Sequence, residues 1–115
     1  MSKRKLGELG ERIALQYLTQ EGFALVDRNF FTRSGEIDLI VQKDALLVFV
    51  EVKWRRDESF GSAAESITWQ KRQRIRATIV HYLLQHPHHG SIRMDALLLD
   101  GQKDHLHITH VRDIQ

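Results

Sequence analysis

Two adjacent segments of alternating side chains constrain the fold of this chain most. Residues 36–42 and 45–54 are rich in Ile, Leu and Val and carry acids or a lysine at alternate positions (36 and 38, 51 and 53), and only Lys43-Asp44 separates them. Such alternation is typical of β-strands, and the short connection predicts an antiparallel hairpin. On the first strand Ile37, Leu39 and Val41 share one face and Glu36, Asp38 and Ile40 the other; on the second, Leu46, Val48, Val50 and Val52 oppose Leu47, Phe49, Glu51 and Lys53.

The register of this hairpin brings charged side chains together. With a two-residue loop, Asp38 faces Phe49 and Glu36 faces Glu51, so that Asp38 and Glu51 become diagonal neighbours with backbones roughly 7–8 Å apart. Lys53 follows Glu51 by two positions and therefore lies on the same face. Three charged groups thus meet where the alternation would allow apolar residues.

The rest of the chain predicts an α/β fold with a mixed sheet flanked by helices. Residues 6–20 repeat apolar side chains at helical spacing, and further apolar stretches are typical of strands. The expected order is α-β-β-β-α-β-β, with helices at 6–20 and 62–85 and strands at 23–29, 36–42, 45–54, 92–99 and 106–111.

Helix and strand ends are predicted from capping and turn residues. Gly22 should end the first helix, and Ser62 with Glu65 has capping-box spacing for the start of the second. Pro87 forbids continuation of that helix, and Asp100-Gly101 should form the turn between the last two strands.

The composition is that of an ordinary small domain. With 115 residues, 42% of them hydrophobic and 28% charged, we expect one domain over residues 1–115 with a single core. The chain has no cysteine, which excludes disulfides and thiolate metal sites and fits a reducing cytosol. The longest apolar run, Ala45 to Val50, is far shorter than the ~20 residues of a membrane helix. We therefore expect a cytoplasmic protein without a membrane partner.

The charges are unevenly distributed along the chain. Residues 36–52 hold four acids and one base, a net −3, whereas residues 53–76 hold seven bases and three acids, a net +4. An acidic cluster beside a basic segment suits a site that holds divalent cations against a polyanion, although solvated surface charge would give the same counts. The candidate nucleic-acid contacts are Arg55, Arg56, Lys71 and Arg72, with Trp54 and Trp69 available for stacking or for packing.

The hairpin carboxylates are candidates for metal chemistry. Asp38 and Glu51 could share one Mg²⁺ or Mn²⁺, with water and substrate phosphate completing its shell. Such a cation neutralises a phosphate and lowers the pKa of bound water, while Lys53 could orient that water or stabilise charge on the phosphate. The alternative is an exposed surface pair of Glu51 and Lys53 at a strand end.

These residues resemble a known signature. Asp38 followed by Glu51-Val52-Lys53 on adjacent strands is similar to the PD-(D/E)XK nuclease motif, with Ile37 in place of its proline. More closely, residues 35–40 and 48–55 resemble the YraN family of small bacterial predicted endonucleases, related in fold to archaeal Holliday-junction resolvases. The likeness extends to Gly7-Glu8-Leu9-Gly10-Glu11 and to Arg93-Met94-Asp95.

The resemblance implies a restriction-endonuclease-like fold and metal-dependent hydrolysis of nucleic acid, with Asp38, Glu51 and Lys53 as catalytic residues. It also suggests Glu11 as a third metal ligand, although an acid there could instead favour the helix dipole. Glu36 could lie at the edge of the site. DNA is the expected substrate, with RNA and branched forms left open, and a symmetric junction would favour a homodimer. The alternatives are a nucleic-acid-binding module without turnover and a protein-interaction subunit.

Overall fold

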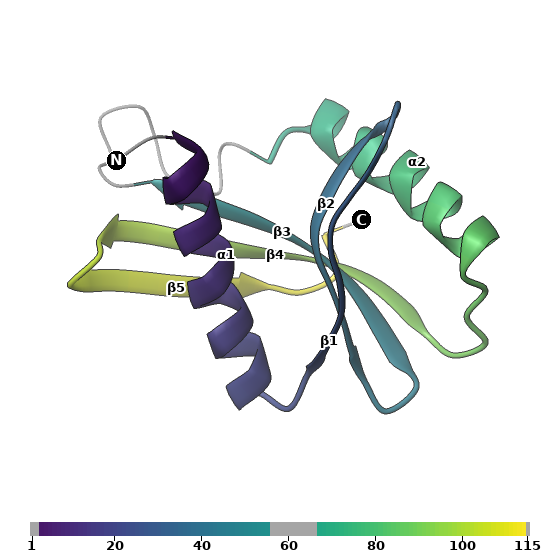
Figure 1. The fold of residues 1–115 in the computed structure, drawn as a ribbon, viewed down its shortest axis with the longest axis horizontal. Coiled ribbons are helices and arrows are strands. Elements are labelled where there is room, and N and C mark those ends of the chain that lie inside the picture. Colours follow the sequence, from purple (N-terminus) through teal and green to yellow (C-terminus); the bar gives the residue numbers. More distant parts are fainter. Residues whose placement is uncertain (1–2, 56–66, 115) are drawn as a thin grey trace.

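The computed structural model describes residues 3–55 and 67–114, and its elements follow the predicted α-β-β-β-α-β-β order. They are α1 (Lys3–Gln20), β1 (Ala24–Thr32), β2 (Gly35–Lys43), β3 (Leu46–Arg55), α2 (Trp69–Gln85), β4 (Ile92–Gln102) and β5 (His105–Val111). The five strands form one sheet in the order β1-β2-β3-β4-β5 (Figure 1). Only β3 and β4 pair in parallel, so the sheet is mixed as predicted.

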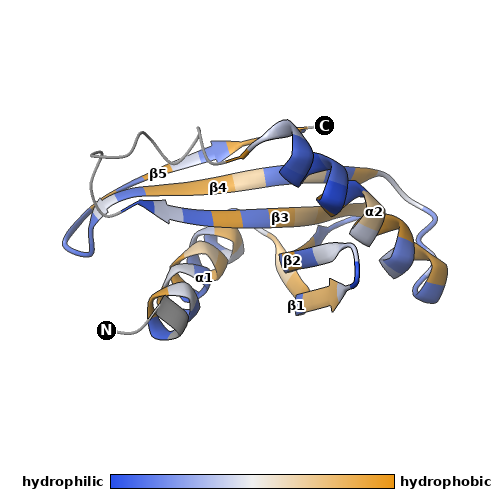
Figure 2. Ribbon diagram, turned by 90° about the horizontal axis from the view of Figure 1, so that it is seen from above, coloured by the Kyte–Doolittle hydropathy of each residue, from blue (hydrophilic) through white to orange (hydrophobic). Residues whose placement is uncertain are grey.

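Two apolar clusters lie on opposite faces of the sheet. Ala14 and Leu18 of α1 pack with Val48 and Val50 of β3 in one cluster. Ile75 and Tyr82 of α2 pack with Leu47 and Phe49 in the other. The alternation of β3 is therefore confirmed: its successive side chains serve the two helices in turn. Figure 2 shows the hydrophobic stretches of β3 and β4 in the middle of the sheet.

The predicted alternation of β2 fails at one position. Leu39 packs in the α1 cluster, but Ile37 joins Ile40 in the α2 cluster, so the pattern breaks at Asp38. The reason is that the pairing of β2 with β3 ends at Leu39–Val50. Beyond it the β1–β2 hairpin leaves β3 and extends to α2 (Figure 1), where Gly35 lies against Thr78 and Arg74. β1 accordingly runs three residues past its predicted end at Asn29.

The predicted register of the β2–β3 hairpin is wrong by two residues. Lys43 pairs with Leu46 and Gln42 with Leu47, so the loop is Asp44-Ala45. Asp44 has a φ of 54°, a left-handed conformation that Asp tolerates better than most residues. Because a shift of two leaves every side chain on its face, the alternation could not reveal it.

The start of α2 and the turn after β4 also differ from the prediction. α2 begins at Trp69, since Ile67 and Thr68 are not helical and the Thr68 hydroxyl accepts a hydrogen bond from the Lys71 N–H at 3.1 Å. Ser62 and Glu65 lie outside the described residues. Gly101 is not in a turn but inside β4, where its φ of 109° is accessible to glycine.

Gly22, by contrast, ends α1 as predicted, with a φ of 97°. Among the described helices, none has the length and apolar content needed to cross a membrane.

Candidate functional site

The candidate site lies where β2 separates from β3. Asp38 and Glu51 come directly after the last pair of this ladder, Leu39–Val50. The Val52 N–H donates to Asp38 Oδ2 at 2.8 Å, so the Asp38 side chain takes the place of a backbone acceptor. Both carboxylates line the same two clefts, but they lie just beyond the paired part of the strands, so the diagonal arrangement predicted from a continuous ladder does not apply.

Burial makes this carboxylate pair electrostatically costly. The Glu51 residue is 7% exposed, and Asp38 is half-buried. Loss of water and the negative charge of Glu51 raise the pKa of Asp38 to about 8, against the opposing hydrogen bond from Val52, and Glu11 and Glu36 add to the rise. A cation at this position would relieve the repulsion.

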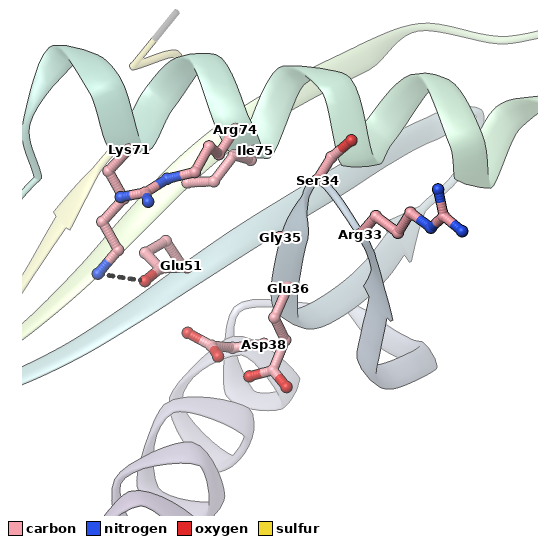
Figure 3. Close-up of a pocket in the computed structure, with 9 residues that line it drawn as sticks. All are labelled: Arg33, Ser34, Gly35, Glu36, Asp38, Glu51, Lys71, Arg74 and Ile75. Atoms are coloured by element: carbon pink, nitrogen blue, oxygen red, sulfur yellow. Dashed lines mark ion pairs between the residues drawn. The ribbon is translucent and has the colours of Figure 1, made fainter.

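One lysine of α2 compensates part of this charge. Lys71 Nζ lies 2.9 Å from Glu51 Oε1 (Figure 3). Lys71 lies at helical spacing from Ile75 and Tyr82, which are both buried against the sheet, and its side chain reaches the site. Its predicted contact with nucleic acid stays a prediction. The ion pair with Glu51 was not foreseen, because the hairpin offered Lys53 as the nearer partner.

Lys53 follows Glu51 on the same face of β3. It lines a cleft of about 590 Å³ together with Glu11, Asp38, Glu51 and Lys71. Burial lowers the pKa of Lys53, and the positive charges of Lys71 and Arg55 lower it further. Lys53 is thus a half-buried amine beside two carboxylates, as the sequence predicted.

The two further acids lie at the rim of the site. Glu11 accepts hydrogen bonds from Asn29 Nδ2 at 3.2 and 3.3 Å. Burial and the charge of Glu36 raise the pKa of Glu11, which places Glu11 near the acidic cluster. Glu36 is exposed and lines a second cleft of about 420 Å³ with Asp38 and Glu51 (Figure 3).

The ligand set available to a metal is small. Within the described residues no three His, Asp or Glu side chains are arranged to hold a metal ion. A cation would therefore have Asp38 and Glu51 as its side-chain ligands. Glu11, which accepts hydrogen bonds from Asn29, would not be a direct ligand.

The arginines predicted to contact nucleic acid do not all lie at the site. Arg55 lines the cleft that contains Lys53. Arg72 instead donates to the Ile114 carbonyl at 3.4 Å and lines a separate apolar pocket. Arg56 lies outside the described residues.

The two tryptophans, for which stacking and packing were both open, differ in their surroundings. The Trp54 Nε1–H donates to the Gly101 carbonyl at 2.8 Å, so Trp54 is held by a hydrogen bond. Trp69 is 65% exposed at the start of α2.

Comparison with known proteins places the chain in a family. Residues 10–99 match the model described as uncharacterised protein family UPF0102. A UPF0102 protein of Rhodococcus jostii is 44% identical over 110 residues, 94% of this chain and 93% of the relative. One of Alkaliphilus metalliredigens is 49% identical over 83 residues, 72% of each chain. One of Photobacterium profundum is 39% identical over 104 residues, 88% of this chain and 83% of the relative. The chain therefore belongs to the UPF0102 family.

Proposed function

We propose that this protein hydrolyses phosphodiester bonds of nucleic acid with Mg²⁺ or Mn²⁺ held by Asp38 and Glu51. The observation that carries the proposal is the pair itself: a buried and a half-buried carboxylate that line the same clefts, with the pKa of Asp38 raised to about 8. Lys71 forms an ion pair with only one of these carboxylates, so the pair keeps an electrostatic cost that stability alone does not explain. Binding a divalent cation is the chemistry that makes it favourable.

The donor set fits a hard cation. Carboxylate oxygens, water and phosphate oxygens are the ligands that Mg²⁺ prefers, and it is commonly held by only one or two protein carboxylates. The Val52 N–H engages Asp38 Oδ2 and Lys71 engages Glu51 Oε1, so each carboxylate keeps acceptor capacity with which Asp38 and Glu51 would hold the cation. When bound, it would neutralise the scissile phosphate and lower the pKa of a coordinated water.

The lysines supply the remaining electrostatics. Lys53 is placed to orient the attacking water or to stabilise the charge that grows on the phosphate. Its lowered pKa also lets it exchange a proton more readily than an exposed lysine. Lys71 holds the Glu51 carboxylate by their ion pair, which fixes the direction of that ligand.

The clefts suit a polyanion. Arg33, Lys71 and Arg74 line one of them and Lys53, Arg55 and Lys71 the other. Lysine and arginine around a carboxylate centre attract phosphates while the cation is held between the acids. Together with the Asp38 and Glu51-Val52-Lys53 spacing on adjoining strands, this supports the restriction-endonuclease-like function expected from the sequence.

The test is cleavage of a panel of labelled single-stranded, duplex and branched substrates in Mn²⁺, Mg²⁺ or EDTA. We expect cutting by the wild type only with metal, and none by Asp38→Asn. Asp44→Asn is the matched control, because Asp44 is exposed in the distant hairpin loop and Asn tolerates its left-handed backbone. If metal-dependent cutting is absent while nucleic acid still binds, the protein is a binding module. If neither occurs, the basic clefts serve a protein partner.

A further inference from the structure

The aromatic ring of Phe31 is exposed to solvent close to the carboxylate site. Phe31 lies near the end of β1 and is 74% exposed. It does not belong to an apolar patch, because Thr32 and Arg33 follow it and Glu36 pairs with it across the hairpin. An isolated ring among polar and charged groups is a poor protein interface but a suitable partner for a planar, polar ligand.

The β1–β2 hairpin that carries this ring packs against α2 through its other face. Phe30 packs edge-on against Tyr82 of α2, with ring centroids 5.1 Å apart, and its strand partner Ile37 lies in the same core. Because neighbouring residues of a strand point to opposite faces, Phe30 faces α2 and Phe31 faces away from it. The Phe31 ring is therefore presented on a supported strand.

The ring is directed to the rim of the site. Phe31 and Glu36 are direct partners in the β1–β2 ladder, so their side chains share a face with Cβ atoms roughly 4.5–5.5 Å apart. Glu36 lines the cleft that contains Asp38 and Glu51, and its charge acts on Asp38. Figure 3 shows the Glu36 and Asp38 carboxylates next to each other.

The same cleft provides phosphate contacts. Arg33, Lys71 and Arg74 line it together with the carboxylates. Phe31 does not line this cleft but lies beside it, as the strand partner of Glu36 at its rim. This is the combination that binds single-stranded nucleic acid, where basic groups follow the backbone and a ring stacks on a base. A base inside a duplex is already stacked on its neighbours and cannot offer its face to Phe31.

We infer that the site takes an unpaired nucleotide, whose base stacks on Phe31 next to the phosphate bound at Asp38 and Glu51. The substrate class is thus single-stranded nucleic acid, or the unpaired segment of a branched one. The position of the scissile bond rests on the proposed function, whereas stacking on Phe31 is a binding event that can be measured without cleavage.

The experiment is fluorescence anisotropy of a labelled oligothymidylate and of a blunt duplex, both in EDTA to prevent cleavage. Phe31→Ala should weaken binding of the single strand by roughly 5- to 150-fold, the loss expected for one base–aromatic stack, and leave duplex binding unchanged. Phe31→Trp should restore the affinity, and Phe31→Leu should not. Leu84→Ala is the control, because Leu84 is 76% exposed on α2 and lines neither cleft.

The outcomes separate this inference from the proposed function. Equal single-strand affinity for Phe31→Ala and wild type overturns the stacking site, even if the wild type cuts with metal. A wild type that binds duplex better than the single strand also overturns it. If Phe31→Ala changes the oligomeric state in sedimentation and not the affinity, the ring is a contact between copies, and the inference fails. If stacking is found but no substrate is cut, the nuclease proposal fails and the inference stands.

Discussion

Two aspartates on the central strands, both withdrawn from water, behave in opposite ways. Asp95 of β4 is fully buried and accepts hydrogen bonds from Arg93 at 2.8 and 2.9 Å, from His110 Nε2 at 2.7 Å and from the Asp113 N–H at 3.0 Å. Burial alone would raise its pKa, but the bonds from His110, Arg93 and Asp113 lower it to about 2. Asp38 has one backbone hydrogen bond and acidic neighbours, and its pKa rises to about 8.

A structural carboxylate differs from a functional one in how its charge is balanced. The charge of Asp95 is balanced by donors from its own chain, so this residue stabilises the junction of β4 and β5. The charge of Asp38 is not balanced in this way, which is why its pKa is raised. A carboxylate with a raised pKa in an accessible cleft indicates a functional site. A buried carboxylate whose hydrogen bonds are all made within the protein indicates a structural role.

The largest effect should come from removing the charge of Asp95. Asp95→Asn leaves Arg93 and His110 without their anionic partner, and breaking a buried ion pair of this kind costs roughly 3–5 kcal/mol. Urea unfolding at pH 8 measures this loss. Asp38→Asn is the matched variant and should be neutral or stabilising there, because it removes an unfavourable charge. An equal loss in both variants would mean that Asp38 also has a structural role.

The second effect concerns catalysis at Lys53. Lys53→Met keeps the apolar stem and removes the ammonium group, so the variant should stay folded and still bind Mn²⁺ and nucleic acid. Its cleavage rate should fall by ~100-fold, the scale for losing one preorganised electrostatic group. Single-turnover assays on a substrate that the wild type cuts give this ratio. A rate equal to that of the wild type would exclude a catalytic role for Lys53.

The third effect concerns the pH dependence of the free energy of unfolding, to which Asp95 and Asp38 contribute with opposite sign. Asp95 has its pKa lowered from 3.8 to about 2, so its contribution is present above pH 4 and is lost as the pH falls toward 2, a decrease of about 2 kcal/mol. Asp38 has its pKa raised from 3.8 to about 8, so stability falls as the pH rises between these values. Unfolding free energies across this range, compared with those of Asp38→Asn, should show this fall flattened in the variant. Parallel profiles would contradict the raised pKa.

The smallest expected effect is on the salt dependence of nucleic-acid binding, and it distinguishes Arg55 at the site from Arg72 near the C-terminal segment. Arg55→Ala should flatten the salt dependence of nucleic-acid binding by about one unit, the value for one lost phosphate contact. Arg72→Ala should leave that slope unchanged, since Arg72 bonds the Ile114 carbonyl and does not line the clefts of the site. Binding isotherms at a series of salt concentrations provide both slopes. A change for Arg72 alone would move the nucleic-acid surface toward the C-terminal segment.

Much of the fold could be predicted because side-chain periodicity reflects which face is buried. The faces of β3 and the order of elements follow from this rule, and the same rule brought Asp38, Glu51 and Lys53 together. The pairing of Arg93 with Asp95 is of the same kind, because residues two apart share one strand face.

What could not be predicted depends on contacts between distant segments. The β2–β3 register follows from the left-handed backbone at Asp44, and the start of α2 from the cap at Thr68. The bond of His110 to Asp95, and that between Tyr17 Oη and His110 Nδ1 at 3.3 Å, join residues that no local pattern relates. Local rules thus located the candidate site, while tertiary packing decided which charges are balanced.

The most direct test of the central claim is titration calorimetry with Mn²⁺ at pH 7 on the wild type, Asp38→Asn and Asp44→Asn. We expect saturable binding by the wild type and by Asp44→Asn, with uptake accompanied by release of a proton from Asp38, because its pKa of about 8 leaves it largely protonated before the metal binds. Asp38→Asn should show little binding and no such release. Equal Mn²⁺ affinity in Asp38→Asn and the wild type would contradict a cation site at Asp38 and Glu51.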